Sequence, residues 1–231
     1  MRAFLDTAAI LQAMLPLPAG GAQLKPTRPA LPKEFVASRK RRRIVDAMTE
    51  LSAEKGYGAT KIADVVRRAG VARKTLYDNF GGKEEIFLAA VDAAIEESLD
   101  RVEAACAAAG DGWSDRVAAG LQTFLAYLAE NPAAAKICLV EAISATPTSS
   151  ARYREATQRF VDLLTRNAPS GAGASDTTAE SLVGGVAWIL HQQVRQGGTD
   201  RALDLTPQLL DFILFPYQGV AEPGSGTGRR K

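Results

Sequence analysis

The chain has 231 residues, of which 46% are hydrophobic, and its net charge is only +2, so it is long enough for one large or two small domains with a proper core. Its two cysteines, Cys106 and Cys138, lie far apart, which argues against a disulfide framework and favours a reducing compartment, so we expect a cytoplasmic protein. The sequence contains no run of about eighteen apolar residues, and we therefore expect no membrane-spanning helix.

The near-neutral total conceals two segments of opposite charge. Residues 33–83 hold 13 Lys and Arg against 6 Asp and Glu, whereas residues 84–231 hold 12 against 19. Because the positive charge is concentrated in one short segment, we expect that segment to meet a polyanion and the acidic remainder to have a different role.

Residues 1–33 are predicted to form a mobile arm ahead of the folded part. Apolar residues at helical spacing suggest a marginal helix between Phe4 and Leu15, and a proline-rich stretch follows it. An export signal is the alternative, because a cationic residue precedes the apolar run. Asp6 and Gln12 interrupt that run, which favours the arm.

The folded part is expected to begin at residue 34, where apolar residues start to recur at helical spacing. Ile44, Met48 and Leu51 share one face of a first helix. Gly56 follows that helix in the position of a C-cap, so we expect the helix to end there.

The next two predicted helices are short. Thr60 offers an N-cap for the first, and Gly70 ends it. The second is expected over residues 73–79, after a turn of three residues that includes the glycine. Two short helices joined by such a turn, the second of them basic, are the outline of a helix-turn-helix.

The remainder of the chain is also predicted to be helical. Apolar residues recur along a long helix over about residues 83–109. Further helices are expected around residues 117–128, from Asn131-Pro132, around residues 153–164, from a capping box that begins at Thr177, and from Thr206-Pro207 to Phe215. A flexible loop is expected at 168–175 and a disordered tail from 220. We find no credible strand and no internal repeat, so the predicted fold class is all-α.

The helix over residues 73–79 meets the physical requirements of a recognition helix. It fits the major groove of DNA, and Arg73 and Lys74 near its start can reach guanine or phosphate oxygens. Thr75 can donate to a phosphate, and Tyr77 can direct its hydroxyl to the DNA backbone. The glycines before Lys83 leave the first amides of the long helix open to a phosphate.

The segment TKIADVVRRAGVARKTLYDNFGGKEEIF, residues 60–87, resembles the N-terminal module of TetR-like transcriptional repressors. The resemblance is close over about residues 38–90, and beyond residue 115 only the number of helices is similar. It implies a homodimer that binds a double-stranded operator and is released by a small, lipophilic effector. By this resemblance Thr60, Thr75, Tyr77 and Lys83 would contact phosphate, and Arg73 and Lys74 are the candidate base readers. Arg43, from the basic run at residues 39–43, and Lys61 are further DNA-binding candidates.

The resemblance also implies a domain division and shows two departures. A three-helix DNA-binding domain is expected over residues 34–82 and a helical ligand-binding and dimerisation domain over residues 83–219, with a tail at 220–231. Ala72 stands where the family often has a capping Ser or Thr, and Asp78-Asn79 replaces a more usual aromatic or His pair. The operator sequence therefore does not transfer from a relative.

Six residues of the second domain are candidates for the effector site: Cys106, Phe124, Tyr127, Glu141, Trp188 and His191. Core packing is the alternative for the aromatic residues and the cysteines. A metal site at His191, the only histidine of the chain, would need partners, and neither Cys106 nor Cys138 is close to it in sequence, so we expect no metal and no other cofactor. Gly184-Gly185 lies within an apolar helix and suggests either a close helix approach, across a dimer axis for example, or a local kink.

Two other classes of function remain open. An enzyme is disfavoured, because the sequence shows no nucleophile elbow, no paired Cys and His and no phosphate loop, and we predict no catalytic residue. A helical protein that binds DNA without sequence preference is the second alternative. The sequence leaves open whether a regulator of this kind represses or activates.

Overall fold

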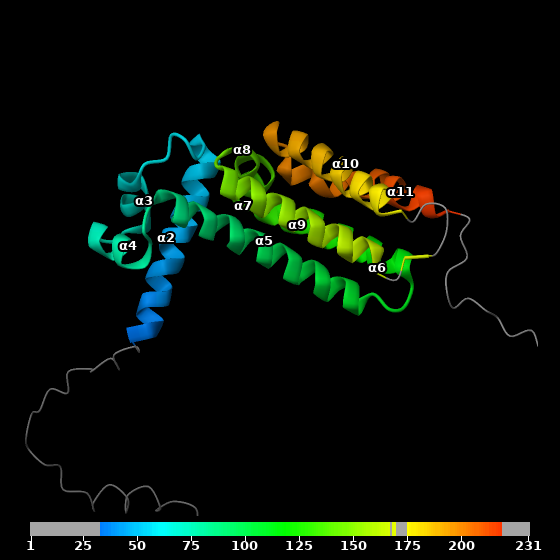
Figure 1. Cartoon of the computed structure of the whole chain (residues 1–231), viewed down its shortest axis with the longest axis horizontal. Coiled ribbons are helices and arrows are strands. Elements are labelled where there is room, and N and C mark those ends of the chain that lie inside the picture. Colours follow the sequence, from blue (N-terminus) through cyan, green and yellow to red (C-terminus); the bar gives the residue numbers. More distant parts are fainter. Residues whose placement is uncertain (1–32, 167, 170–174, 219–231) are drawn as a thin grey trace, which may run out of the picture.

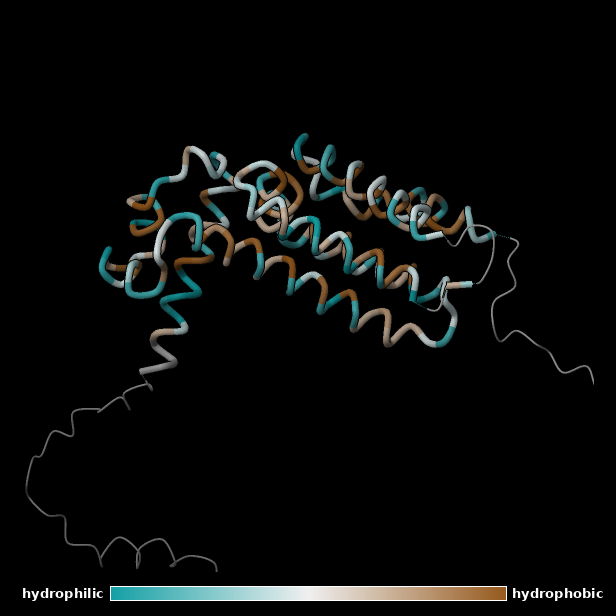
Figure 2. Tube along the Cα trace, viewed as in Figure 1, coloured by the Kyte–Doolittle hydropathy of each residue, from teal (hydrophilic) through white to brown (hydrophobic). Residues whose placement is uncertain are grey.

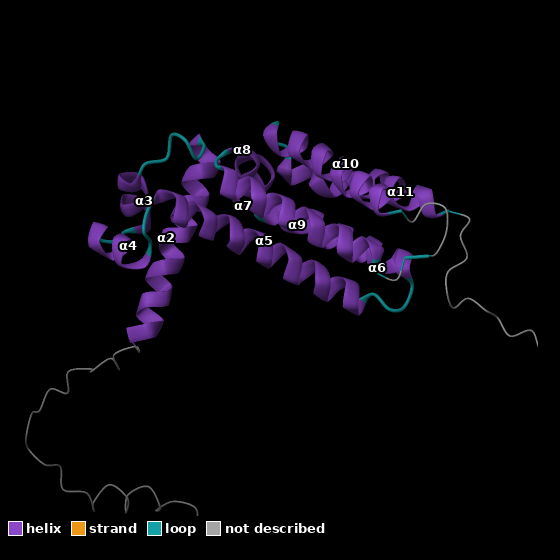
Figure 3. Cartoon of the chain, in the orientation of Figure 1, coloured by secondary structure: helices purple, strands orange, loops and turns teal. Residues whose placement is uncertain are grey.

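The computed structural model describes residues 33–166, 168–169 and 175–218. Within these ranges the chain forms helices and turns and contains no strand (Figure 3), which confirms the all-α prediction. The predicted arm lies outside the described residues, apart from its last position, and so do most of the predicted loop at 168–175 and the whole tail.

Three helices form a compact unit at one end of the molecule (Figure 1). They are α2 (Lys33–Lys55), α3 (Ile62–Ala69) and α4 (Arg73–Asn79). The backbone turns through left-handed conformations at Gly56 (φ 84°) and Gly70 (φ 60°), where a glycine carries no Cβ penalty. Both predicted helix ends and the bounds of the second short helix are confirmed.

A long helix, α5 (Lys83–Ala108), connects this unit to the rest of the chain. Its first half packs on the small unit and its second half runs along α6 (Trp113–Glu130) to the opposite end (Figure 1). We call α2, α3, α4 and the first half of α5 the head, and the remaining helices the body. The predicted long helix is confirmed to within one residue.

The body continues from α6 with shorter elements, then longer ones. These are α7 (Pro132–Lys136), the π-helix η1 (Ile137–Glu141), α8 (Ala142–Ser144), α9 (Pro147–Thr165), α10 (Asp176–Arg195), the 3₁₀ helix η2 (Thr199–Leu205), α11 (Thr206–Leu214) and the 3₁₀ turn η3 (Phe215–Tyr217). The π-helix and η2 were not predicted. Among the helices that the structure describes, none combines the length and the apolar character that a membrane span needs.

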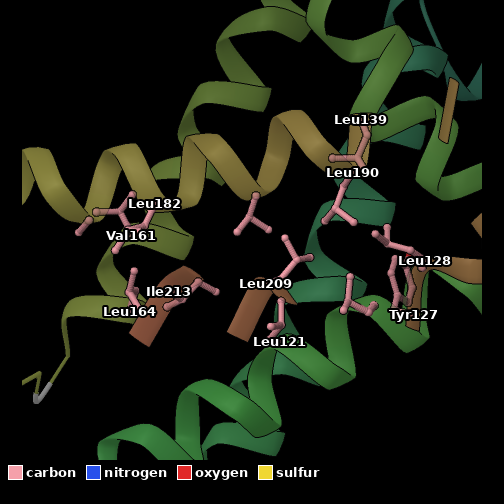
Figure 4. Packing of buried hydrophobic residues seen from close by; sticks show 14 of the residues in the cluster. Leu121, Tyr127, Leu128, Leu139, Val161, Leu164, Leu182, Leu190, Leu209 and Ile213 are labelled. Carbon is pink, nitrogen blue, oxygen red and sulfur yellow. The ribbon is translucent and has the colours of Figure 1, made fainter. Parts of the chain in front are cut away.

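Apolar side chains fill the space between the helices. Figure 2 shows hydrophobic residues along the facing sides of α5 and the body helices, while the stretch of α2 that projects away is largely hydrophilic. In the body core, leucines and other apolar residues of α6, α9, α10 and α11 point toward one another (Figure 4), among them Leu121, Tyr127, Leu128, Leu164, Leu182, Leu190, Leu209 and Ile213. The head core extends into the body through the buried Ile137 and Ala142.

Two predicted helix caps are wrong. The N-cap of α3 is Lys61 rather than Thr60, because the Thr60 hydroxyl donates to the Gly56 carbonyl oxygen (2.9 Å) and closes the turn after α2. Helix α10 begins two residues before the predicted box, since Ser175 is its N-cap and its hydroxyl oxygen accepts from the Thr178 amide (3.1 Å). Where several hydroxyl residues follow one another, each can compete for the cap.

The glycine pair of α10 has a local explanation. A Cβ on Gly185 would lie 3.1 Å from the Phe212 ring of α11, whereas a Cβ on Gly184 would meet nothing within 4 Å. Helix α10 continues through both positions. The close approach that the sequence suggested is therefore made within one chain, at Gly185.

Candidate nucleic-acid interface and apolar cavity

Helix α4 is anchored on one side and exposed on the other. The side chains of Leu76 and Phe80 are buried in the head core, while Arg73 and Lys74 are exposed and 47% of the Tyr77 surface is accessible. An α-helix fits the major groove of B-DNA. The arrangement fixes the helix by its apolar face and presents cationic and phenolic groups outward.

Arg73 and Tyr77 support one another on the exposed face. They lie four positions apart, which places them on neighbouring turns of the helix. Nη2 of Arg73 is 3.5 Å from the Tyr77 hydroxyl, and its guanidinium carbon is 5.7 Å from the centre of the ring. In the described ranges, no acidic side chain forms an ion pair with Arg73 or Lys74.

Other basic residues of the head are already paired within it. Arg68 contacts Glu54 and Glu50, both at 2.8 Å, and its hydrogen bond to Glu54 lowers the pKa of that carboxyl. Arg67 contacts Asp64 at 2.7 Å. Exposed pairs of this kind contribute little to stability, but they remove these charges from the set that can meet a polyanion.

Lys83 lies at the start of α5, over the turn that follows α2. Its ammonium nitrogen is 4.0 Å from the centre of the Tyr57 ring and donates to the Gly58 carbonyl oxygen at 3.3 Å. Burial lowers the pKa of this ammonium group. The Gly81 amide donates to the Glu85 carboxylate at 2.6 Å, so a phosphate at this helix start would lie beside a carboxylate of the chain itself.

Two of the DNA-binding candidates use their polar groups inside the head. Arg43 donates to the Gly70 carbonyl oxygen at 3.1 Å, which ties α2 to the turn before α4. Thr60 is buried, with 1% of its surface exposed. Thr75 is partly buried and Lys61 is exposed. DNA contact by these four residues stays a prediction, and for Thr60 it requires the buried hydroxyl to become accessible.

The body contains an apolar cavity of about 300 Å³, partly open to the surface, between α5, α6, α9 and α10. Three of the six effector-site candidates, Cys106, Phe124 and Tyr127, line this cavity. The Tyr127 hydroxyl donates to the Ala94 carbonyl oxygen at 3.2 Å, so its polar atom is satisfied within the protein. Burial raises the pKa of Tyr127.

The charged groups of the cavity lining are found near its Cys106 end. Glu103 of α5, Arg116 of α6 and Arg166 after α9 contribute to the lining, where α5 ends, α6 begins and α9 ends (Figure 1). Burial raises the pKa of the Cys106 thiol, and the two arginines partly oppose this rise. This end lies away from the head.

The opposite part of the wall, toward the head, contains the second cysteine. Cys138 and Leu139, both in η1, line the cavity there. Burial raises the pKa of the Cys138 thiol to about 12, so at neutral pH the group is a thiol rather than a nucleophilic thiolate. Both cysteines are free, and they act here as small wall residues.

The remaining three effector-site candidates, Glu141, Trp188 and His191, lie outside the cavity lining. The Glu141 carboxylate accepts from the Tyr57 amide at 2.7 Å. Trp188 is 61% exposed and stacks on His191, with ring centres 5.6 Å apart. In α10 it is Val183, Val186 and Ala187 that line the cavity. Each step along a helix turns the side chain by about 100°, so Trp188 faces elsewhere.

His191 has a structural partner. Its Nδ1 lies 2.6 Å from the Leu139 carbonyl oxygen, and because a carbonyl can only accept, Nδ1 carries the proton and donates. Across the described ranges, no group of three or more His, Cys, Asp or Glu residues is arranged to hold a metal ion.

Comparison with known proteins gives two kinds of similarity. Residues 44–90 match the family described as "Bacterial regulatory proteins, tetR family". The HTH-type transcriptional activator FasR of Mycolicibacterium smegmatis is 22% identical over 183 residues, which are 79% of this chain and 83% of FasR. The fatty acid metabolism regulator protein of Bacillus subtilis is 33% identical over 60 residues, 26% of this chain and 31% of that protein.

The fold is shared with solved structures. FadR from Bacillus subtilis, in complex with stearoyl-CoA, superposes with a TM-score of 0.66 at 18% identity, over 78% of this chain and 99% of that one. FadR from Bacillus halodurans superposes with a TM-score of 0.68 at 17% identity, over 80% and 97% of the two chains. At this level of identity the likeness concerns the fold.

Proposed function

Because the chain is a TetR-like transcriptional regulator, we propose that it is a sequence-specific repressor whose operator affinity falls when an anionic, acyl-bearing molecule occupies the cavity. The division into a DNA-binding part up to residue 82 and a ligand-binding part from residue 83 belongs to this proposal. The observation that carries it is the combination of an anchored, outward-facing basic helix with an apolar cavity in one chain.

The exposed face of α4 supports sequence-specific binding. Arg73 and Lys74 are exposed near the start of α4, and groups there can reach base edges in the major groove. Tyr77 and Lys83 are proposed as contacts to phosphate, which position the protein on DNA without reading sequence. A protein that contacted only phosphate, and no base edges, would bind all duplexes alike.

Exposed apolar side chains support a homodimer. Trp188 and Ile189 of α10 are accompanied by Phe212 of α11 and Phe215, of which 72% is exposed. Aromatic groups exposed together mark association surfaces. Pairing α10 and α11 with those of a second copy would cover these residues and set two α4 helices about 34–36 Å apart, the spacing of successive major grooves.

The cavity supports an effector with a long apolar chain and an acidic end. Its walls are largely apolar, whereas Arg116 and Arg166 both line the end near Cys106, away from the head. An anionic group there would gain two cations, although Glu103 offsets one of them. FadR from Bacillus subtilis, which shares this fold, was solved with stearoyl-CoA, and this supports an acyl effector for the present chain.

The test uses the full chain and an operator selected from random genomic fragments. Stearoyl-CoA, stearate and uncharged methyl stearate are titrated against the protein and operator while fluorescence anisotropy reports DNA binding. We expect the two anions to weaken operator binding by roughly 5- to 150-fold, and the uncharged ester to act less. FasR is named an activator. If the two anions instead tighten operator binding, the effector would promote DNA binding rather than release, and the assignment of the cavity as the effector site would stand.

Two results would contradict the proposal. A chain that stays monomeric and prefers no duplex over bulk DNA would be the second candidate, a helical protein that coats DNA without sequence preference. If the chain binds its operator and none of the three lipids changes that affinity, the cavity is not the site of an acyl effector. Matched variants Arg116→Gln and Arg166→Gln should reduce the difference between stearate and its methyl ester.

A further inference from the structure

Part of the cavity wall toward the head is formed by Cys138 and Leu139 of the π-helix η1, residues Ile137–Glu141. Ala94 of α5, which belongs to the head core, lines the cavity as well. The Ala142 amide donates to the Ile137 carbonyl oxygen, five positions back, and normal α-helical pairing resumes where the Ala145 amide donates to the backbone carbonyl oxygen of Glu141. Single π-turns inside helices are rare and frequent at functional sites. This one contacts both the cavity, which Cys138 and Leu139 line, and the head core, in which Ile137 is buried.

One end of this segment is bonded to the head. The Glu141 carboxylate accepts from the Tyr57 amide at 2.7 Å, in a partly buried position. It lies against the turn that ends α2, since a Cβ on Gly56 would be 3.6 Å from the same carboxylate oxygen. Hydrogen bonds to ionised groups are about twice as strong as neutral ones, and this one joins residues 84 positions apart in the chain.

Tyr57 in turn supports the residue proposed to contact phosphate. Its ring packs on Phe87 with ring centres 4.4 Å apart, and the Lys83 ammonium lies 4.0 Å above it. Lys83 also donates to the Gly58 carbonyl oxygen of the same turn. The turn at residues 56–60 therefore contacts both Glu141 of the body and Lys83 at the start of α5.

The middle of the π-helix is bonded to the body. The Leu139 carbonyl oxygen accepts from the His191 ring of α10 at 2.6 Å, and the Leu139 side chain lines the cavity together with Cys138. A ligand that fills the cavity toward Cys138 must contact this segment. If the extra residue of a π-turn then migrates along the helix, each residue it passes rotates by about 100°, which would remove the Glu141 carboxylate from Tyr57.

We propose that Glu141 is a positioning residue for DNA binding, and that filling the cavity beside Cys138 acts on the turn at residues 56–60 and on Lys83 through the Glu141 hydrogen bond. The inference rests on the proposed function, because it assumes that cavity occupancy regulates the head. It assigns Glu141 a part that is distinct from ligand contact, in keeping with its place outside the cavity lining.

A double-mutant cycle tests this without knowledge of the effector. Cys138→Phe places a permanent apolar group in the cavity beside η1, and Glu141→Ala removes the acceptor for the Tyr57 amide. We expect Cys138→Phe to change the operator Kd about tenfold in the native background and less than about twofold in the Glu141→Ala background. Glu141→Gln, which keeps an acceptor oxygen, should restore part of the coupling.

The matched control is Glu155→Ala, which removes an exposed carboxylate of α9 whose partner is Arg152 of the same helix. In that background Cys138→Phe should keep its tenfold effect. An equal effect of Cys138→Phe with and without Glu141, or no effect in a folded native background, overturns the proposal. If thermal melts show that Cys138→Phe does not fold, Cys138→Met takes its place.

Hydrogen exchange gives a readout that is independent of DNA. Both Glu141→Ala and Cys138→Phe should speed exchange of the Tyr57 amide in the full chain, and Glu155→Ala should not. Unchanged protection at residue 57 in Cys138→Phe overturns the coupling. Should the native chain bind no operator at all, the proposed function fails, and this exchange measurement still decides whether the cavity and the head communicate.

Discussion

The head and the body of this molecule use apolar side chains in opposite ways. In the head, Ile44, Met48, Leu76 and Phe80 are almost completely buried, and the cations are left outside. In the body, the apolar faces of the packed helices leave a cavity of about 300 Å³ between them. Close packing fixes geometry, whereas a cavity lowers stability. The contrast assigns rigid presentation to the head and adjustable packing to the body.

The largest expected effect is on the packing of the head. Phe80→Ala should lower the free energy of unfolding by about 3–5 kcal/mol, because a fully buried aromatic ring is lost and a cavity is left. DNA binding should be lost with it. Circular dichroism melts measure the change, and Leu203→Ala, at an exposed leucine of η2, is the control with little effect. Equal losses at both sites would mean that the head is not close-packed.

The next effect concerns base recognition by the exposed face of α4. Lys74→Ala should reduce discrimination at one or two base pairs by about 1–3 kcal/mol, because only that side chain reads them. Competition with operators substituted at each position gives the measurement. A loss that is uniform over all sequences would instead make Lys74 a contact to the DNA backbone.

A smaller effect of the opposite sign is expected in the body. Ala156 is buried and lines the cavity, so Ala156→Val should fill part of the space and stabilise the chain by about 0.5–2 kcal/mol. Affinity for the acyl effector should fall at the same time. Thermal unfolding with and without stearoyl-CoA checks both statements, and destabilisation by the added methyl groups would show that the cavity is already filled on average.

Lys83→Ala should weaken binding to all duplexes alike. Removing one contact to phosphate makes the slope of log K against log salt less negative by about 1. Lys136→Ala, at a lysine of the body helix α7, is the control and should leave the slope unchanged. If the slope of Lys83→Ala matches that of the native chain, Lys83 only supports the Tyr57 turn and does not contact phosphate.

The last effect is an alkaline destabilisation of the body. Burial raises the pKa of the Cys138 thiol from 9.0 to about 12, so the folded state binds this proton more tightly than the unfolded state. The stabilisation is complete below pH 9 and is lost as the pH rises toward 12. Tyr127 shifts in the same direction. Melts between pH 8 and pH 11 should therefore show a smaller decrease for Cys138→Ala than for the native chain.

The head was predictable because its signals are local. Gly56 and Gly70 have left-handed backbones that few other residues adopt, and the spacing of Leu76 and Phe80 fixes the buried side of α4. The roles of Arg43 and Thr60 were less accessible, because their partners, the carbonyl oxygens of Gly70 and Gly56, depend on how the turns fold.

The body was predictable only in outline. Its cavity is assembled from helices far apart in the sequence, so apolar spacing identified faces without showing which of them meet. Glu141 belongs to the π-helix and its carboxylate accepts from the Tyr57 amide, a long-range partner that helical spacing does not reveal. For Trp188 and His191, aromatic or imidazole character drew attention, yet their neighbours Val186 and Ala187 line the cavity.

The two tryptophans of the chain occupy contrasting surroundings. Trp113 lines the cavity, and its indole N–H donates to the Leu164 carbonyl oxygen at 2.8 Å, whereas Trp188 lies on the surface beside His191. The chain thus carries two intrinsic fluorophores, one buried and one exposed to water, whose emission maxima should differ. Replacing either one with phenylalanine would leave a single fluorophore, Trp113 to report on the cavity or Trp188 to report on the proposed dimer surface.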